Sequence, residues 1–324
     1  MESDDGRRAH VKFNEDLIHI AAEVEETQQT QRPVVALEST VIAHGLPYPD
    51  NVAAALEMED AVRAEGAVPA ILAVMDGRLR VGLTPVEIER LACGREPVAK
   101  LSRRNLAVAV AGGGLGATTV AATIIGAWVA GIPVMATGGI GGVHRGAPQT
   151  FDISADLAEL ARYPVIVVCA GAKSILDLPL TRELLETLGV PVLGYGTDEF
   201  PAFYSRTSGL AVDGRVDTPE DVVRVIEAKR DLELDGGVLV VNPVPEADAL
   251  DAAVVAAAVE RAQAEADARG IRGKDLTPFL LARVAALTGG ASLAANRSLL
   301  RHNARLAGRL AVALHNHFRE EDDW

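Results

Sequence analysis

The sequence predicts an α/β protein in which helices cover both faces of a mostly parallel central sheet (an α/β/α sandwich), with a helical C-terminus. Short apolar runs alternate along the chain with segments whose apolar residues recur at helical spacing. The runs are apolar throughout, which is typical of parallel strands buried on both faces. Hydrophobic residues make up 49% of the chain and aromatic ones only 4%, beside 30 glycines, so Ala, Val, Leu and Ile must build the core between tight turns.

Residues 1–30 are predicted to form a polar lead-in with one amphipathic helix over residues 14–26. Residues 31–324 are predicted to form a single α/β catalytic domain. No fixed-period repeat, low-complexity linker or shift in composition marks a boundary inside that segment.

In the first half of this domain, an apolar run predicts a strand over 34–37, and helical spacing after a proline-rich turn predicts a helix over 51–64. A second apolar run predicts a strand over 68–75, and Asp76-Gly77 is a hairpin signal that leads into a strand over 79–82. Thr84 and Glu87 have capping-box spacing with proline between them, so a helix begins there. A further strand is predicted over 107–111 and a helix over 118–130.

In the second half, the same alternation predicts strands over residues 134–137, 165–169, 190–194 and 237–242. The helices between and after them are predicted over residues 155–162, 180–188, 219–232, 249–269, 277–287 and 293–317.

Charge and composition limit the classes of function. The formal charge of -14 argues against a nucleic-acid polymer and against an anionic membrane as partner, but a small phosphorylated substrate needs only a local cluster of donors. Two cysteines, Cys93 and Cys169, indicate neither a disulfide framework nor a thiolate zinc site. Because no apolar leader or membrane-length run is visible, we expect a cytoplasmic protein.

Lys173 is the most informative residue. It follows the predicted strand 165–169 after a break at Gly171, among apolar neighbours that disfavour an unpaired ammonium. Desolvation would lower the pKa of this lysine and make it an amine nucleophile able to form an imine with a sugar carbon. The alternative is a lysine that extends past the strand end into solvent.

Two glycine-rich segments follow predicted strands. Residues 112–119 would expose backbone N–H groups and a helix N-terminus to an anion, or would simply allow tight packing. Residues 137–146 also bring the hydroxyl of Thr137, the imidazole of His144 and the guanidinium of Arg145 to a strand exit, which suits a phosphate or sugar hydroxyls. The alternative for this second segment is a mobile surface loop.

Further polar residues are candidates for the same edge of the sheet. Glu38 ends a predicted strand and is a candidate acid. Lys100 opens a basic cluster in an acidic chain and is either a phosphate contact or a solvated turn. Asp152 is a candidate ligand for a divalent cation such as Mg²⁺ or Mn²⁺. Ser154 is predicted to cap the next helix, and Asp156 to favour its positive first turn.

Long strings around these residues resemble the pseudouridine-5'-phosphate glycosidases, also called the indigoidine synthase A-like family. The strings are, in order, residues 36–49, 100–104, 137–146, 151–157, 170–173, 196–201 and 294–296. Departures are small: Asn105 stands where an aspartate is common, and Val41 and Ala43 replace close analogues.

The resemblance implies a Mn²⁺-dependent enzyme of the carbon–oxygen lyase class, acting as a homotrimer. It would reversibly cleave the C–C glycosidic bond of pseudouridine 5'-phosphate to give uracil and ribose 5-phosphate. Carried over onto this sequence, Glu38 protonates the ring oxygen, Lys173 is the nucleophile at C1', and Asp152 ligates Mn²⁺. Substrate contacts are implied at Lys100, at the backbone of Val120 and at Ser154, Ala155 and Asp156; Thr137, His144 and Asn296 are added from their chemistry and location.

Three alternatives stay open. Lys173 would also serve a Schiff-base aldolase or sugar-phosphate lyase, which needs a substrate carbonyl. A non-catalytic nucleotide- or phosphate-binding module would use the glycine segments and leave Lys173 structural. A paralogue acting on a related C-nucleotide would differ only in the shape of its base pocket.

Overall fold

The computed structural model describes residues 15–273 and 276–320. The strands are β1 (Ile18–Ile20), β2 (Val34–Leu37), β3 (Val68–Met75), β4 (Arg78–Val81), β5 (Ala99–Leu101), β6 (Gly116–Thr118), β7 (Val134–Ala136), β8 (Ile166–Cys169), β9 (Val192–Tyr195), β10 (Gly214–Val216) and β11 (Val238–Val241). The helices are α1 (Ala22–Gln29), α2 (Asp50–Arg63), α3 (Pro85–Ala92), α4 (Arg103–Gly112), α5 (Val120–Val129), α6 (Ala147–Thr150), α7 (Ala155–Arg162), α8 (Leu178–Thr187), α9 (Pro219–Asp231), α10 (Ala252–Ala268), α11 (Leu276–Leu287) and α12 (Ala291–Glu320).

The described strands form one sheet in the order β1-β4-β3-β2-β7-β8-β11-β9-β10, with β6 paired to β3 and β5 paired to β6. Pairing is parallel except where β3 meets β4 and β6. The central strands β2, β3, β8 and β11 are buried at every residue, as continuous apolar runs require. The predicted fold class, a mostly parallel sheet covered by helices and followed by a helical C-terminus, is confirmed.

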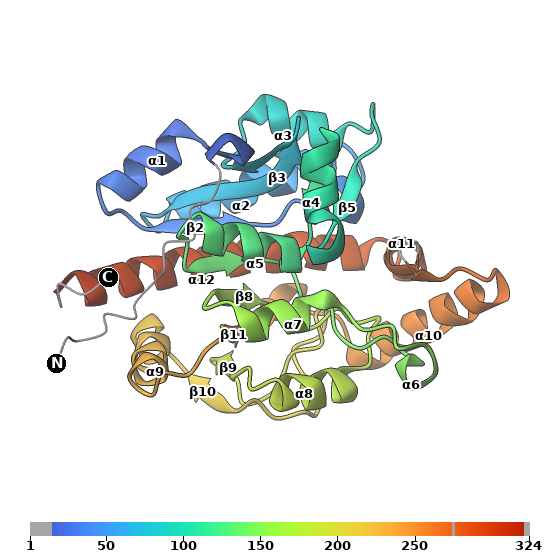
Figure 1. The fold of residues 1–324 in the computed structure, drawn as a ribbon. Coiled ribbons are helices and arrows are strands. Elements are labelled where there is room, and N and C mark those ends of the chain that lie inside the picture. The colour runs from blue at the N-terminus through green and yellow to red at the C-terminus, as the bar shows by residue number, and fades with distance from the viewer. Residues whose placement is uncertain (1–14, 274–275, 321–324) are drawn as a thin grey trace.

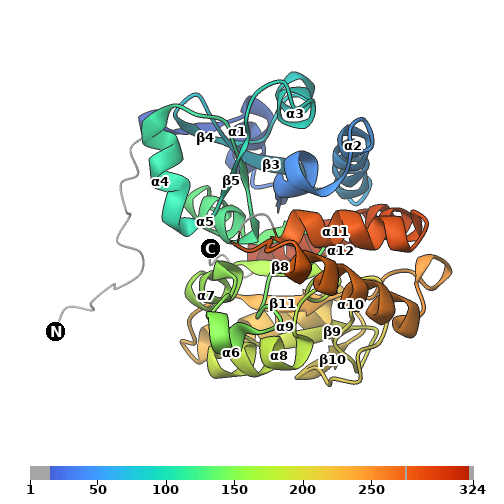
Figure 2. The same ribbon diagram turned by 90° about the vertical axis from the view of Figure 1, so that its right-hand side faces the viewer.

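Helices from distant parts of the chain cover the two faces of the central strands (Figures 1 and 2). In Figure 2, α5 and α7 lie on one side of β8, and α12 lies on the other side together with α2. The long helix α12 crosses the middle of the molecule in Figure 1 and packs against α2, α9, β7 and β8. Helix α12 contacts elements from the first half of the chain, such as α2, and from the second half, such as α9. The last helix of the chain therefore closes the core over the central strands.

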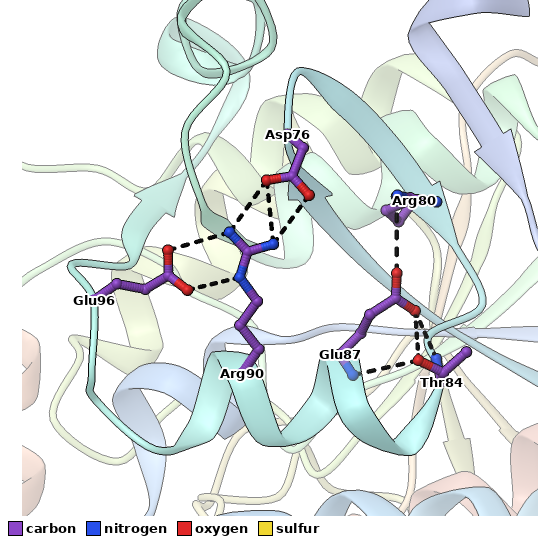
Figure 3. A network of polar contacts seen from close by, with 6 residues as sticks. All are labelled: Asp76, Arg80, Thr84, Glu87, Arg90 and Glu96. Carbon is purple, nitrogen blue, oxygen red and sulfur yellow. Dashed lines mark hydrogen bonds and ion pairs between the residues drawn. The ribbon is translucent and has the colours of Figure 1, made fainter.

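The start of α3 follows the sequence prediction closely. Thr84 accepts a hydrogen bond from the backbone N–H of Glu87, and the Glu87 carboxylate accepts one from the N–H of Thr84 at 2.9 Å. Figure 3 shows this capping box and, one turn later, Arg90 placed between the carboxylates of Asp76 and Glu96. The contact between Arg90 and Asp76 ties α3 to the tight turn between β3 and β4.

The predicted strand over 107–111 is wrong, because this segment lies in helix α4. Its continuous apolar run is compatible with a helix as well as with a strand, and Ser102 and Asn105 form a capping box that fixes the helix start. The glycine segment that follows therefore ends a helix: Gly113 takes the left-handed conformation (φ 67°) that terminates α4 before β6.

The predicted helix over 14–26 is also largely wrong. Residue 14 lies outside the described residues, and Ile18–Ile20 form the edge strand β1, which pairs in parallel with β4. Helix α1 begins only at Ala22. Residues 18–20 form backbone hydrogen bonds with the edge of β4, and this pairing favours a strand although the spacing of the apolar side chains favours a helix.

Within the described residues no single helix has the length and apolar character to cross a membrane; α11 and α12 together have them, but they are bent by 116° at their junction.

Candidate active site

Three of the predicted site residues follow the carboxyl ends of strands that are neighbours in the middle of the sheet. Glu38 directly follows β2, Thr137 directly follows β7, and Lys173 comes four residues after the end of β8. Since β2, β7 and β8 are consecutive parallel neighbours, their ends bring these three residues to one edge. Ligands of open α/β sheets bind at this edge.

Glu38 is buried and held from two sides. The hydroxyl of Thr40 donates to one carboxylate oxygen and the hydroxyl of Thr137 donates to the other. One hydroxyl comes from the turn that follows β2 and the other from the residue that follows β7, so the orientation of the carboxyl group depends on the ends of both strands. A fixed carboxyl group at a strand end is suited to deliver a proton to one position.

Lys173 is half-buried, and the turn that delivers it depends on glycine. Gly171 has φ +85°, and a Cβ there would lie 2.1 Å from the carbonyl oxygen of Pro201. The amide of Lys173 donates to the carbonyl of Ile140 at 3.1 Å, which ties this turn to the glycine segment after β7. The backbone of Lys173 is thereby fixed to the segment after β7, and the turn before it passes close to the segment after β9.

Lys100, in β5, brings a second ammonium to the site. Much of its side chain is exposed, yet desolvation lowers the pKa of Lys100, and the positive charge of Lys173 lowers it further. The carboxylates of Asp156, Glu38 and Asp152 act in the opposite direction. These four charged groups therefore lie within electrostatic reach of Lys100, although the five residues come from four separate segments of the chain.

Residues 137–143 of the glycine segment after β7 are buried, so the alternative of a surface loop is wrong for them. A Cβ on Gly141 would lie 2.3 Å from the Ser154 hydroxyl, and one on Gly142 would lie 2.4 Å from the Thr181 hydroxyl. These glycines permit the segment to pass close to the starts of α7 and α8. Close packing, rather than an open anion loop, explains the repeated glycines.

Asp156 joins three parts of the site. Its side chain is only 4% exposed, one oxygen accepts from the amide of Ala121 at 2.8 Å, and the other accepts from the amide of Gly141 at 2.7 Å. Ser154 caps α7, as predicted, by accepting from the amide of Asp156 at 3.3 Å. Ala155 is the first residue of the same helix. Asp156 thus fastens α5 and the glycine segment to α7; the substrate contacts of Ser154, Ala155 and Asp156 stay predictions.

Asp152 and His144 are neighbours in the same site and are joined through their backbones. The amide of His144 donates to the carbonyl of Asp152 at 3.0 Å. Burial lowers the pKa of His144, the carboxylate of Asp152 opposes this change, and Lys100 and Lys173 add to it. The described residues contain no group of three or more His, Cys, Asp or Glu side chains that would hold a metal ion. A cation here would depend on Asp152 together with water and substrate oxygens, a donor set that Mn²⁺ accepts.

Val120 and Asn296 border the site from opposite faces of the sheet. Val120 is the first residue of α5, and its amide takes no part in the backbone hydrogen bonds among the described residues. Asn296, on α12, is buried, and its side-chain oxygen lies 3.5 Å from the position of a Cβ on Gly138. Asn303, two turns further along α12, donates to the carbonyl of Thr137 at 2.9 Å and so holds the helix against the end of β7.

His44 is a residue whose role does not follow from the sequence, and the structure adds it to this site. It lies in a π-helical turn, Val41–Gly45, just after Glu38. Burial and the charge of Lys100 lower the pKa of His44, so the imidazole is neutral at neutral pH. The unusual string around residues 36–49 was the only signal for it in the sequence.

Comparison with known proteins shows which proteins this chain is similar to. The family model for indigoidine synthase A-like proteins matches residues 23–313. A pseudouridine-5'-phosphate glycosidase of Caldanaerobacter subterraneus subsp. tengcongensis is 54% identical over 94% of this chain and 98% of its own length. One of Methylobacterium nodulans is 57% identical over 92% of this chain and 88% of its own length.

Two solved structures have the same fold. The prealnumycin C-glycosynthase AlnA in complex with ribulose 5-phosphate matches with a TM-score of 0.87 and 44% identity, over 94% of this chain and 99% of AlnA. An indigoidine synthase A-like protein of Thermotoga maritima matches with a TM-score of 0.84 and 36% identity, over 92% of this chain and 97% of its own. The chain therefore belongs to the indigoidine synthase A-like family.

Proposed function

We propose that this protein reversibly cleaves the C–C glycosidic bond of pseudouridine 5'-phosphate to give uracil and ribose 5-phosphate. The observation that carries the proposal is the meeting of a buried acid, Glu38, with two lysines, Lys100 and Lys173, at one edge of the sheet. The names of relatives that share more than half of their residues with this chain support the same reaction.

The reaction needs an acid and a nucleophile because a uracil carbon is a poor leaving group. Glu38 donates its proton to the ring oxygen of the ribose while the bond from that oxygen to C1' breaks. The amine of Lys173 forms a bond to C1' and releases a proton. The bond from C1' to the uracil carbon then breaks, the carbon takes up a proton, and the nitrogen of Lys173 and C1' become an imine.

Water hydrolyses this imine and restores the free lysine and the aldehyde of ribose 5-phosphate. The net change is one pseudouridine 5'-phosphate plus one water to one uracil plus one ribose 5-phosphate. In the opposite direction the reaction removes water, which corresponds to the carbon–oxygen lyase class.

The remaining site residues bind and orient. The ammonium of Lys100 and the amide of Val120, at the N-terminus of α5, would bind the anionic sugar phosphate together with Ser154, Ala155 and Asp156. Thr137 orients Glu38, and His144 and Asn296 would contact the sugar and the base. Asp152 would hold one Mn²⁺ per subunit, and the cation would stabilise negative charge on base or phosphate oxygens.

The proposal includes a homotrimer in the cytoplasm. Helix α4 contains no buried residue, and Val108 is 70% exposed between the half-buried Leu106 and Val110. An apolar helix face of this kind is typical of an interface. We expect Val108→Glu to reduce the mass measured by light scattering from that of a trimer toward that of a monomer.

A second candidate is the synthesis of a related C-nucleotide from another acceptor ring. It is favoured by the similarity to a C-glycosynthase whose structure holds a five-carbon sugar phosphate. The same Lys173 chemistry, run toward bond formation, would serve both reactions.

Turnover assays separate these candidates. The protein with Mn²⁺ should convert pseudouridine 5'-phosphate to uracil and ribose 5-phosphate, measured by chromatography. Lys173→Ala and Glu38→Gln should each lose at least about a thousandfold in kcat. Absence of uracil from the wild type would reject the first candidate. Condensation of ribose 5-phosphate with a different ring would then support the second.

A further inference from the structure

His44 has a polar atom with no partner. Its Nε2 is shielded from solvent and makes no hydrogen bond to any described residue. A buried polar atom left unpaired costs free energy, so a protein retains one mainly where it has a function. His44 is also part of a π-helical turn, a rare conformation that occurs mostly at functional sites.

The turn that carries His44 is firmly held. The side-chain amide of Asn51, on α2, donates to the carbonyl of Ile42 at 2.7 Å and to that of Ala92, at the end of α3, at 3.2 Å. The π-helical turn packs against α2, α3 and α11. The imidazole is therefore presented by a backbone that is fixed from several sides.

The positive charge of Lys100 adds to the effect of burial in lowering the pKa of His44. The ammonium of Lys100 carries three donors at the end of a flexible stem that is exposed for much of its length. Strand β5, which carries Lys100, pairs with β6, and the amide of Ser39, five residues before His44, donates to the carbonyl of Thr118 in β6 at 3.3 Å, so β6 links the segments that carry the two side chains. A carboxylate partner would cancel the positive charge of Lys100, whereas a neutral imidazole accepts a hydrogen bond and leaves the charge for an anion.

We propose that His44 is a positioning residue for Lys100, whose ammonium donates one hydrogen bond to His44 Nε2 when a sugar phosphate is bound. The other two ammonium hydrogens then point toward the phosphate. The inference rests on the proposed function only in assigning the sugar phosphate to Lys100. His44 acts through Lys100 and need not contact the reacting atoms.

Binding of ribose 5-phosphate, measured by calorimetry, tests this role without requiring turnover. His44→Met keeps the volume and removes the acceptor, while His44→Gln restores a polar atom near the position of Nε2. We expect His44→Met to raise the Kd about tenfold and His44→Gln to stay within about threefold of the wild type. His302→Gln is the matched control, because the charged groups that lower the pKa of the half-buried His302 are all arginines. The Kd of this variant should equal that of the wild type.

A double-mutant cycle separates positioning from a general structural effect. In the Lys100→Met background, His44→Met should cause no further loss, because the group that it positions is gone. An equal loss in both backgrounds, or an unchanged Kd for His44→Met in the wild type, would overturn the proposal. Turnover of pseudouridine 5'-phosphate by the wild type is measured separately, so failure of the proposed reaction is distinguishable from failure of this inference.

Discussion

The hydroxyl of Thr137, at the end of β7, donates a hydrogen bond to the carboxylate of Glu38, at the end of β2. The two residues are 99 positions apart in the sequence and meet because β2 and β7 are parallel neighbours. Thr40 donates to the other carboxylate oxygen. The acid of the proposed reaction is thus oriented by the sheet itself rather than by one flexible loop.

Thr137→Val should lower kcat about tenfold and leave KM nearly unchanged, because the loss of one donor disturbs the proton donor and not the bound sugar. Thr137→Ser keeps the hydroxyl and should retain most of the activity. Steady-state kinetics with pseudouridine 5'-phosphate provides both values. If KM rises while kcat is preserved, Thr137 is a substrate contact and does not orient Glu38.

Asp156→Ala should reduce the free energy of unfolding by about 3 kcal/mol, because two buried amides, of Ala121 and Gly141, lose their acceptor. Asp177→Ala is a useful contrast: Asp177 caps α8 by accepting from one amide, so its loss should cost about 1 kcal/mol. Urea unfolding measures both. Equal costs would mean that Asp156 does not fasten α5 to the glycine segment.

Arg103 and Glu159 should respond unequally to substitution. The Glu159 side chain is 2% exposed and its partner Arg103 is 41% exposed. Arg103→Met leaves a buried carboxylate without its cation and should cost about 3 kcal/mol, whereas Glu159→Gln leaves an arginine that water solvates and should cost about 1 kcal/mol. Thermal or urea unfolding of the two variants tests this order; the reverse order would contradict it.

Glu59 should make stability depend on pH. Burial, which outweighs the charge of Arg63, raises the pKa of Glu59 to about 7 from its ordinary value of 4.5. The folded state therefore binds a proton more tightly than the unfolded chain, and this contribution is lost as pH rises from about 5 through 7. Glu59→Gln should match the wild type at pH 5 and be more stable by about 2 kcal/mol at pH 8.

Much of this architecture could be predicted because strand and helix signals rarely conflicted. Strands β2, β3, β8 and β11 are continuous apolar runs, and parallel strands need such runs when both faces are buried. The failures are local. Strands β5 and β6 have only three residues each and owe their conformation to pairing with each other and with β3, which no local pattern reports.

The site was predictable where function depends on strand ends. Glu38, Thr137 and Lys173 follow apolar strands directly or after a short turn, so the parallel sheet alone brings them together. The two-sided role of Asp156 and the unpaired nitrogen of His44 were not predictable, because both depend on contacts between segments that are far apart in the sequence. Likewise, Gly141 and Gly142 permit close packing against Ser154 and Thr181, which the sequence does not reveal.

The most direct test of the central claim is the intact mass of the protein after incubation with ribose 5-phosphate, Mn²⁺ and borohydride, for wild type and for Lys173→Ala. The account predicts one reduced sugar-phosphate adduct per chain in the wild type and none in Lys173→Ala, because borohydride reduces the imine on Lys173 to a stable amine. An adduct of equal yield in Lys173→Ala, or none in the wild type, would contradict the claim that Lys173 is the nucleophile.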